Sequence, residues 1–307
     1  MRHTILLILL APTLLWAQGN PNFEIGLQLD NDSFVSTYND FYYTSGLLAF
    51  ANYKSAKSSA EKIIVHSFTL KQQIYNPREV KSPFQEDHNR PYAGYFSAEY
   101  KNTKLYSSNS VLSWSFGLGI IGPDSKAEAF QNWMHRSFSF GDIIGWEQQI
   151  RNLPVVQLGC TYATPVFSKI TSEKIDFHWY SQSEIGTAFV GVAAGTLGRI
   201  SLLKQLTPMQ NSNFYTGFGS AQKEFYFFVL PKINIQLYDA TIQGSMFTDD
   251  SPVTFDLNPL RFKGEAGFKY KYHHYNLSAV FHYTTDEIRN SSSQGYYYGS
   301  LGFSYSF

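Results

Sequence analysis

Acidic and amide side chains cluster early in the chain. Asp30, Asn31 and Asp32 are consecutive at the end of an alternating apolar segment. Oxygen ligands at this spacing suit a hard cation such as Ca²⁺, with the Asp32 carboxylate as the metal-binding group. A solvated Asp/Asn turn explains the same residues equally well. If strand alternation continues through Asp32, its side chain points into the interior together with Gln28 and Asp30.

A histidine stands in a segment whose periodicity is helical. Residues 125–128 have capping-box spacing, and the pattern that follows up to 138 has the helical rather than the strand period. Gln131 and His135 then share one helix face at i, i+4 spacing, which could hold His135 over the mouth of a barrel. An imidazole can take a proton from water near neutral pH. Surface decoration is the commoner explanation of a lone histidine on a loop helix.

Basic side chains follow residue 76. They are Arg78, Lys81, His88 and Arg90. Such a group could hold phosphate, or it could be the basic decoration that suits anionic lipid head groups.

Four of these residues converge if the intervening segments are strands. Asp32, Thr44, Arg90 and His135 come from three predicted loops that strand alternation places at one end. A cation could polarise an ester carbonyl while imidazole activates water, so an esterase without a serine nucleophile is possible. G-x-S-x-G, H-E-x-x-H and Walker motifs are absent from the sequence.

The elements that would position these residues are strands of period two. Apolar residues alternate with small or polar ones in 22–31, 110–122 and 294–307, and the polar face of 261–273 carries Lys263, Glu265 and Lys269. A soluble core seldom places such charges inside, although the C-terminal strand alone would also fit a soluble sandwich. A barrel with a polar lumen directs the apolar face to lipid. We therefore predict an all-β fold, a twelve-stranded antiparallel transmembrane β-barrel with a short helix in an extracellular loop.

The connections alternate in length. We expect short periplasmic turns and long outer loops, at 32–40, 76–91, 123–151, 193–223, 248–260 and 288–293. The predicted strands are 22–31, 41–54, 62–75, 92–106, 110–122, 152–168, 174–192, 224–238, 239–247, 261–273, 275–287 and 294–307.

Composition and the first residues agree with export to a membrane. Residues 1–17 have the charged start, short apolar run and small-residue exit of a signal peptide, which leaves 18–307 as a single barrel domain. The chain has 26 Phe and 22 Tyr with only 16% charged residues, as lipid-facing strands require. Acidic and basic residues number 24 each, which argues against a nucleic-acid partner.

Several motifs together resemble the outer-membrane lipid A 3′-O-deacylase family. They cover the mature chain in order, although the last 130 or so residues match only as strands, and the most specific stretch is 122–135. The motifs are Leu29-Asp30-Asn31-Asp32, Tyr43-Thr44-Ser45-Gly46, Gln73-Ile74-Tyr75-Asn76-Pro77, Arg90-Pro91-Tyr92-Ala93-Gly94, Ile121-Gly122-Pro123-Asp124, Gln131-Asn132 and His135-Arg136.

This resemblance implies a function and roles for individual residues. Members are twelve-stranded barrels that use Ca²⁺ and remove the 3′-linked acyloxyacyl group of lipid A in the outer leaflet. By resemblance, Asn31 and Asp32 form the acidic site, Thr44 lines it and His135 is the general base.

The substrate-holding residues follow the family less closely. The family's basic pair follows the Gln-Ile-Tyr-x-Pro motif, where this chain has Arg78 and Lys81 without an adjacent Lys-Arg pair. We expect these two residues with Arg90 and Gln131 on the substrate side, and assign Arg90 a structural or rim role. The expected protein is a monomer in the bacterial outer membrane, with lipopolysaccharide as substrate and its active site facing the outer leaflet.

Two other functions remain open on the sequence. An outer-membrane phospholipase A would need a Ser–His pair, for which Ser45 is the candidate serine. A non-enzymatic pore or structural barrel would instead conduct ions through a narrow lumen lined by Lys232, Gln236, Glu265 and Lys269.

Overall fold

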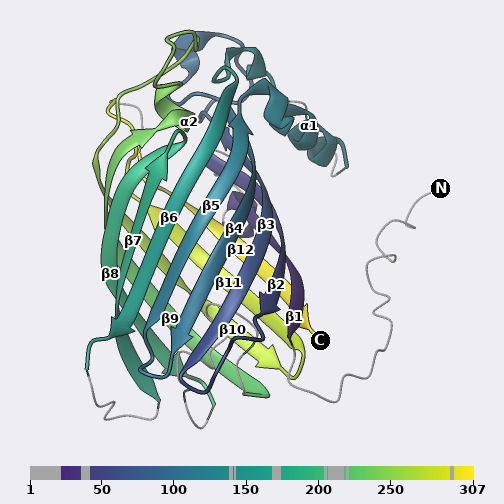
Figure 1. Cartoon of the computed structure of the whole chain (residues 1–307). Coiled ribbons are helices and arrows are strands. Elements are labelled where there is room, and N and C mark those ends of the chain that lie inside the picture. The colour runs from purple at the N-terminus through teal and green to yellow at the C-terminus, as the bar shows by residue number, and fades with distance from the viewer. Residues whose placement is uncertain are drawn as a thin grey trace, which may run out of the picture.

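A closed antiparallel barrel of twelve strands forms the body of the protein (Figure 1). Each strand pairs with its neighbours in sequence, and β1 pairs with β12 to close the ring. This computed structural model describes residues 22–35, 42–137, 141, 143–167, 174–203, 206, 218, 221–290 and 294–307, so the predicted signal peptide lies outside the described residues. None of the helices in these ranges is both long and apolar enough to span a membrane. The predicted fold is confirmed.

The strands are bounded as follows: β1 Phe23–Asn31, β2 Tyr42–Lys54, β3 Lys62–Asn76, β4 Ala93–Tyr106, β5 Val111–Ile121, β6 Leu153–Pro165, β7 Ile175–Gly186, β8 Phe189–Ser201, β9 Lys223–Asp239, β10 Leu260–Tyr272, β11 Tyr275–Thr284 and β12 Tyr296–Ser306. The α-helices are α1 Ala127–Ser137 and α2 Ala240–Gln243, and short 3₁₀ turns include η2 Asp32–Phe34 and η5 Trp146–Gln148. We call the end where β1 stops at Asn31 the upper rim.

Two predicted strands were wrong. The segment 174–192 is not one strand, because β7 and β8 meet there across a two-residue connection. The segment 239–247 is not a strand, because the Asp239 side chain accepts a hydrogen bond from the Thr241 backbone N–H and caps α2. The rule that long connections lie at one end also fails, since 202–222 joins β8 to β9 at the lower rim and 187–188 is a short turn at the upper rim.

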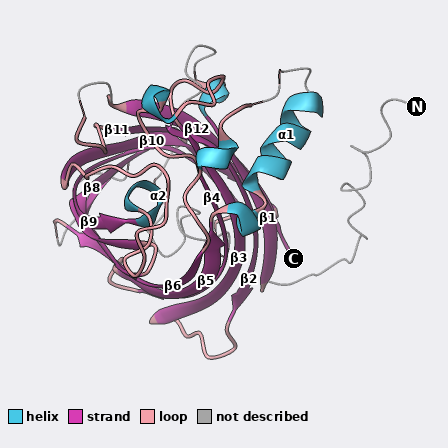
Figure 2. Cartoon of the chain, turned by 90° about the horizontal axis from the view of Figure 1, so that it is seen from above, coloured by secondary structure: helices cyan, strands magenta, loops and turns pink. Residues whose placement is uncertain are grey.

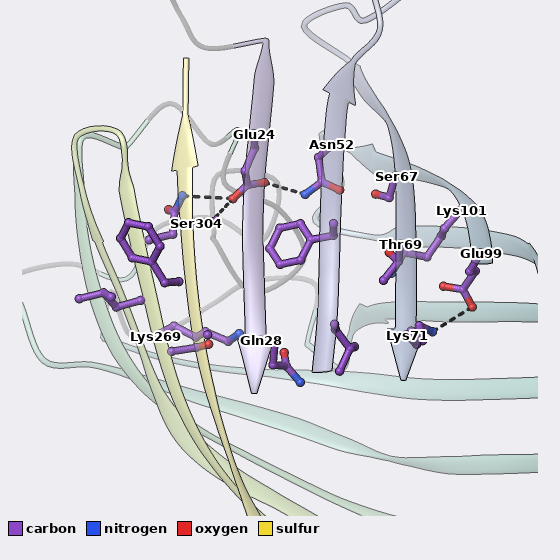
Figure 3. A pocket seen from close by; sticks show the side chains of 17 residues that line it. Glu24, Gln28, Asn52, Ser67, Thr69, Lys71, Glu99, Lys101, Lys269 and Ser304 are labelled. Carbon is purple, nitrogen blue, oxygen red and sulfur yellow. Dashed lines mark hydrogen bonds and ion pairs between the residues drawn. The ribbon is translucent and has the colours of Figure 1, made fainter. Parts of the chain in front are cut away.

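The lumen is polar, as the sequence predicted. A cavity of about 260 Å³ lies inside the wall, between β1–β4 and β10–β12 (Figure 3). The Glu24 carboxylate there accepts hydrogen bonds from Asn52 at 2.7 Å and from Ser304. On the other side of the cavity Lys71 pairs with Glu99 at 3.2 Å. Both carboxylates of this cavity therefore have polar partners within the barrel.

The upper mouth is filled by α2. Seen from above, α2 lies inside the ring of strands and α1 lies outside it (Figure 2). Ala240 of α2 packs in a buried cluster with tyrosines of the wall, among them Tyr43 and Tyr75. This packing argues against a passive pore.

Arg90 holds α2 in the barrel mouth. The side chain is 1% exposed and donates to Thr241 Oγ1 at 2.8 Å, with its guanidinium 4.4 Å from the centre of the Tyr75 ring. Beyond it, Arg261 donates to the Glu287 carboxylate at 3.1 Å. Burial by itself raises the pKa of Glu287, but Arg261, Lys263 and Arg90 hold that pKa below its usual value.

Replacing Arg90 with methionine is expected to destabilise the barrel by about 3 kcal/mol, because it removes the hydrogen bond to Thr241 and a cation that offsets the buried Glu287 carboxylate. The measurement is the temperature at which the compact band disappears in semi-native electrophoresis. Arg78→Met, at an exposed position, is the matched control and should leave that temperature unchanged. An Arg90→Met barrel as heat-resistant as the unchanged protein would contradict this role.

Candidate active site on the outer wall

The predicted acidic residues separate at the end of β1. Asp30 faces inward, where its carboxylate accepts from the Tyr43 hydroxyl at 2.7 Å. Asn31 ends the strand, because its side-chain oxygen accepts from the Ser33 backbone N–H at 2.8 Å and caps η2. Asp32 therefore begins a 3₁₀ turn. The strand alternation on which the lumenal placement of Asp32 depended therefore stops at Asn31.

The η2 turn packs on the outside of the wall. A Cβ atom on Gly299 of β12 would lie 2.9 Å from the Phe34 Cβ, so the glycine admits the turn. Gly299 shares its face with the exposed Leu301 and Phe303, which face lipid. The Asp32 side chain is 5% exposed, and a carboxylate at that depth calls for compensation by a cation or hydrogen bonds.

α1 packs on the same outer face. Gly94 of β4 alternates with the exposed Phe96, and a Cβ at Gly94 would lie 2.2 Å from the Cβ of Ala127 and from the Ser125 hydroxyl. Only a glycine allows this approach. The expectation that the helix holds His135 over the mouth was wrong, because α1 lies beside the wall (Figure 2).

One register row joins the two flanking elements. Along it the cross-strand neighbours are Gly299, Asn31, Ser45, Ile74 and Gly94. η2 rests on the first of these residues and α1 on the last. Within the row, the Asn31 amide donates to the Ser45 hydroxyl at 2.9 Å. The row is thus a strip of outer wall bounded on both sides.

Thr44 enters this strip through a β-bulge. The pairing of β2 with β3 shifts between Tyr43 and Ser45, which makes Thr44 the extra residue. Its hydroxyl is buried and makes no hydrogen bond to the described part of the chain. The two polar side-chain atoms of Asn76, at the end of neighbouring β3, are also buried without a hydrogen bond to the described residues. The same holds for the Oδ1 atom of Asn132 on α1. Buried groups of this kind cost about 1–3 kcal/mol each unless a ligand, ion or water satisfies them.

His135 is oriented by a backbone carbonyl. Its Nδ1 lies 2.9 Å from the Gly141 oxygen, and a carbonyl only accepts. The Nδ1 atom therefore carries the proton and the lone pair resides on Nε2, the tautomer a general base needs.

Three of the four predicted substrate-side residues lie on α1 or on the loop bonded to the segment after it, and the fourth lies in the barrel mouth. Gln131 is buried and accepts from the Trp146 indole at 3.0 Å, which ties α1 to η5. Arg78 and Lys81 are exposed, and their loop is held to the segment after α1 by the Ile144 N–H to Val80 carbonyl bond. Arg90 instead points into the mouth, where it contacts α2, and is separated from these residues.

The oxygen atoms of these residues are of the kind that Ca²⁺ accepts as ligands. No group of three or more His, Cys, Asp or Glu side chains within the described ranges could hold a metal. Ca²⁺ accepts neutral hydroxyl, amide and water oxygens besides carboxylates. The buried oxygens of Thr44 and Asn76 are of this type and are unsatisfied in the described structure. Asp32 would supply the charge.

A family model described as "Outer membrane protein LpxR" matches residues 4–307, almost the whole chain. The chain belongs to the LpxR family of outer-membrane proteins. It is therefore an outer-membrane lipid A deacylase, an ester hydrolase, and the resemblance drawn from its motifs is confirmed. No curated protein sequence matches the chain.

Solved structures resemble this chain to different degrees. LpxR from Salmonella typhimurium matches with a TM-score of 0.74 at 18% identity, over 92% of this chain and 100% of that one. The β-domain of the Bordetella autotransporter BrkA matches with a TM-score of 0.48 at 7% identity, over 94% and 100%. The translocator domain of NalP from Neisseria meningitidis reaches 0.44 at 10%, over 95% and 91%.

Sequence reasoning assigned no role to Asn76 and Asn132, and it missed the glycines that seat the flanking elements. Asn76 belongs to a family motif, so the motif was the available signal. Gly94 and Gly299 carried another: an outward-facing glycine near a rim, among large apolar neighbours, indicates an element packed against the wall.

Replacing Gly94 with valine is expected to lift α1 from the wall and lower deacylation at least about tenfold, since displacing a base by 1 Å can cost about 10²-fold. Gly117→Ala is the control, because its Cβ would find only ordinary contacts at 3.7 Å. Lipid A mass spectra report activity, and limited proteolysis between 122 and 152 reports the position of α1. Full activity with Gly94→Val would show that α1 does not position the base.

Proposed function

We propose that this deacylase removes the 3′-linked acyloxyacyl group of lipid A, with His135 as the general base and Asp32 at a Ca²⁺ site. The observation that carries the proposal is the place of the site on the outer wall. Asn31, Ser45 and Ile74 lie on the face that carries the lipid-facing residues lower on the same strands. A lipid in the surrounding leaflet reaches this strip without entering the barrel.

The chain's own groups fit hydrolysis by activated water. The His135 Nε2 takes a proton from water, and the hydroxide forms a bond to the ester carbonyl carbon. When the tetrahedral intermediate collapses, the bond from that carbon to the 3′ sugar oxygen breaks. The imidazolium returns its proton to this oxygen, which leaves a sugar hydroxyl and a free acyloxyacyl acid.

Charge develops on the carbonyl oxygen during attack. Asp32 would hold Ca²⁺ with the Thr44 hydroxyl and the Asn76 amide oxygen, and a bound Ca²⁺ supplies positive charge that polarises the ester carbonyl. Asn31 is a positioning residue here, because its oxygen caps the turn that carries Asp32.

The basic residues beside the site suit the phosphate of lipid A. Arg78 and Lys81 are exposed on the loop that packs against the α1 segment. A guanidinium can bind phosphate through two parallel hydrogen bonds. We assign the phosphate contact to these two side chains and the outer leaflet as the side on which they work.

The phospholipase alternative is disfavoured by the role of Ser45. The Ser45 hydroxyl accepts from the Asn31 amide, while the His135 Nδ1 bonds to a backbone carbonyl. A serine nucleophile instead needs a hydrogen bond to its base.

The test is mass spectrometry of lipid A from cells that express the intact protein with Ca²⁺ present. The expected result is loss of one 3′-acyloxyacyl mass and appearance of the free acid. Unchanged lipid A, with the barrel shown to be folded in the outer membrane, would overturn the proposal. Release of phospholipid acyl chains would establish the alternative.

A further inference from the structure

Below the candidate site the outer wall is hollowed. The hollow has a volume of about 1260 Å³ and is lined mostly by apolar side chains of β1 to β5, β11 and β12. Its shape follows from alternating size in one register row, which runs Leu27, Ala49, Leu70, Ala98 and Leu118 across five strands.

Two small side chains of β2, Ala49 and Ala51, line this hollow. Ala51 follows Ala49 on the same face and is flanked by Ile25 and Phe68. We call this feature the β2 trough: its floor is Ala49 and Ala51, its walls are Ile25 and Leu27 on β1 and Phe68 and Leu70 on β3. The two walls stand about 10 Å apart, two strand spacings.

The β2 trough lies below the candidate site on the same face of the wall. Ser45 stands on the same face of β2 as Ala49 and Ala51, six residues above the latter. Six residues span about 20 Å along a strand, which is roughly 15 Å along the membrane normal at the usual tilt of about 40°. This equals about half of a hydrocarbon core of about 30 Å. An acyl chain whose ester lies at the site would therefore reach the bilayer centre at the level of Ala51, the lower end of the trough.

One polar group interrupts the apolar path between the site and the trough. Gln72 pairs with Leu47 and Phe96 on the outer face, and its Nε2 is buried without a hydrogen-bond partner among the described residues. An unsatisfied amide donor at membrane depth is costly. An ester carbonyl located in the acyl chain close to the headgroup would accept a hydrogen bond from this amide. An acyloxyacyl group has such a carbonyl, in the second ester that joins its two chains.

We infer that the β2 trough holds an acyl chain of the substrate lipid and that Gln72 donates to the ester carbonyl joining the two chains. This inference rests on the proposed deacylation. It assigns Ala49 and Ala51 the role of a length gauge, because a larger side chain at either position closes the trough at a different depth.

The test compares Ala49→Phe and Ala51→Phe on lipid A carrying long or short acyl chains. Ala49→Phe should lower cleavage of both at least roughly tenfold, while Ala51→Phe should do so for the long chains and spare the short ones. Ala194→Phe on β8 is the matched control: it lies six strands around the barrel in a smaller outward hollow. Equal loss on both chain lengths for every variant, or no loss for any, would overturn the inference.

A second measurement does not require turnover. In the His135→Ala background, native mass spectrometry should show purified lipid A retained by the otherwise unchanged protein and lost with Ala49→Phe but not with Ala194→Phe. Retention that depends on Ala49, together with no deacylase activity in the protein whose His135 is intact, would support the trough and refute the proposed function. Deacylation unaffected by both trough substitutions would leave the function standing and refute the trough.

A third variant addresses Gln72. Gln72→Leu is expected to slow cleavage of the acyloxyacyl substrate by about tenfold relative to a lipid A whose 3′ chain has no secondary ester, since only the former offers the carbonyl. An equal effect on both lipids would remove Gln72 from the inference.

Discussion

Substitution of His135 by alanine is expected to slow lipid A deacylation by roughly 10²- to 10⁴-fold, the usual contribution of a positioned general base. The Gly141 carbonyl fixes the tautomer that leaves the lone pair on Nε2, and alanine removes the only group assigned to deprotonate water. The measurement is the initial rate of release of the acyloxyacyl acid from purified lipid A in detergent.

Two controls make this result specific. Ser45→Ala should retain most activity, because the serine only supports Asn31; its inactivity together with an active His135→Ala would contradict the assigned base. Heat-modifiable migration in electrophoresis should be unchanged in both variants, since His135 lies on a helix outside the wall and Ser45 fills a small position.

Substitution of Asp32 by asparagine, or chelation of Ca²⁺, is expected to slow the reaction by at least about 10²-fold, since a cation that polarises a carbonyl contributes several kcal/mol. Asparagine keeps the size of the side chain in the η2 turn but removes its charge. Activity after chelation should return with Ca²⁺ and not with Mg²⁺, which demands a tighter octahedral site.

The matched control for this prediction is the neighbouring acid. Asp30→Asn changes a carboxylate of the same strand end that faces inward and bonds to Tyr43. Isothermal titration should detect Ca²⁺ binding in the Asp30→Asn protein and none in the Asp32→Asn protein. Equal binding by both variants would place the cation elsewhere.

The barrel was predictable because lipid imposes a strict period of two. Strands such as β5, with Leu112, Trp114, Phe116 and Leu118 on one face, leave no other assignment. The β8 strand was not predicted because its two faces differ little in side-chain size. Gly or Ala occupies positions on both faces, at 191, 193, 194 and 195. The α2 segment was misassigned because nothing local shows that the chain turns into the mouth, where Arg90 receives it.

The residue types of the site were predictable, but the side of the wall was not. Alternation reports facing only while a strand continues, and the Asn31 cap ends β1 one residue before Asp32. Likewise, helical periodicity predicted α1 but not its resting place, which depends on Gly94 of a different strand. The first error comes from a local cap that the strand pattern does not reveal. The second comes from a contact between segments distant in sequence, which a single sequence shows only weakly.

The η2 turn follows β1 yet rests on Gly299 of β12, so it straddles the seam where the two ends of the barrel meet. That seam joins segments nearly the whole chain apart, and contacts of such separation tend to form late in folding. The hydrolase would therefore become active only when the barrel closes. A chain that is still being inserted has all the reactive residues but lacks the β1–β12 pairing on which η2 rests. Lipid encountered before insertion would then be left intact, and the first turnover would report a closed barrel.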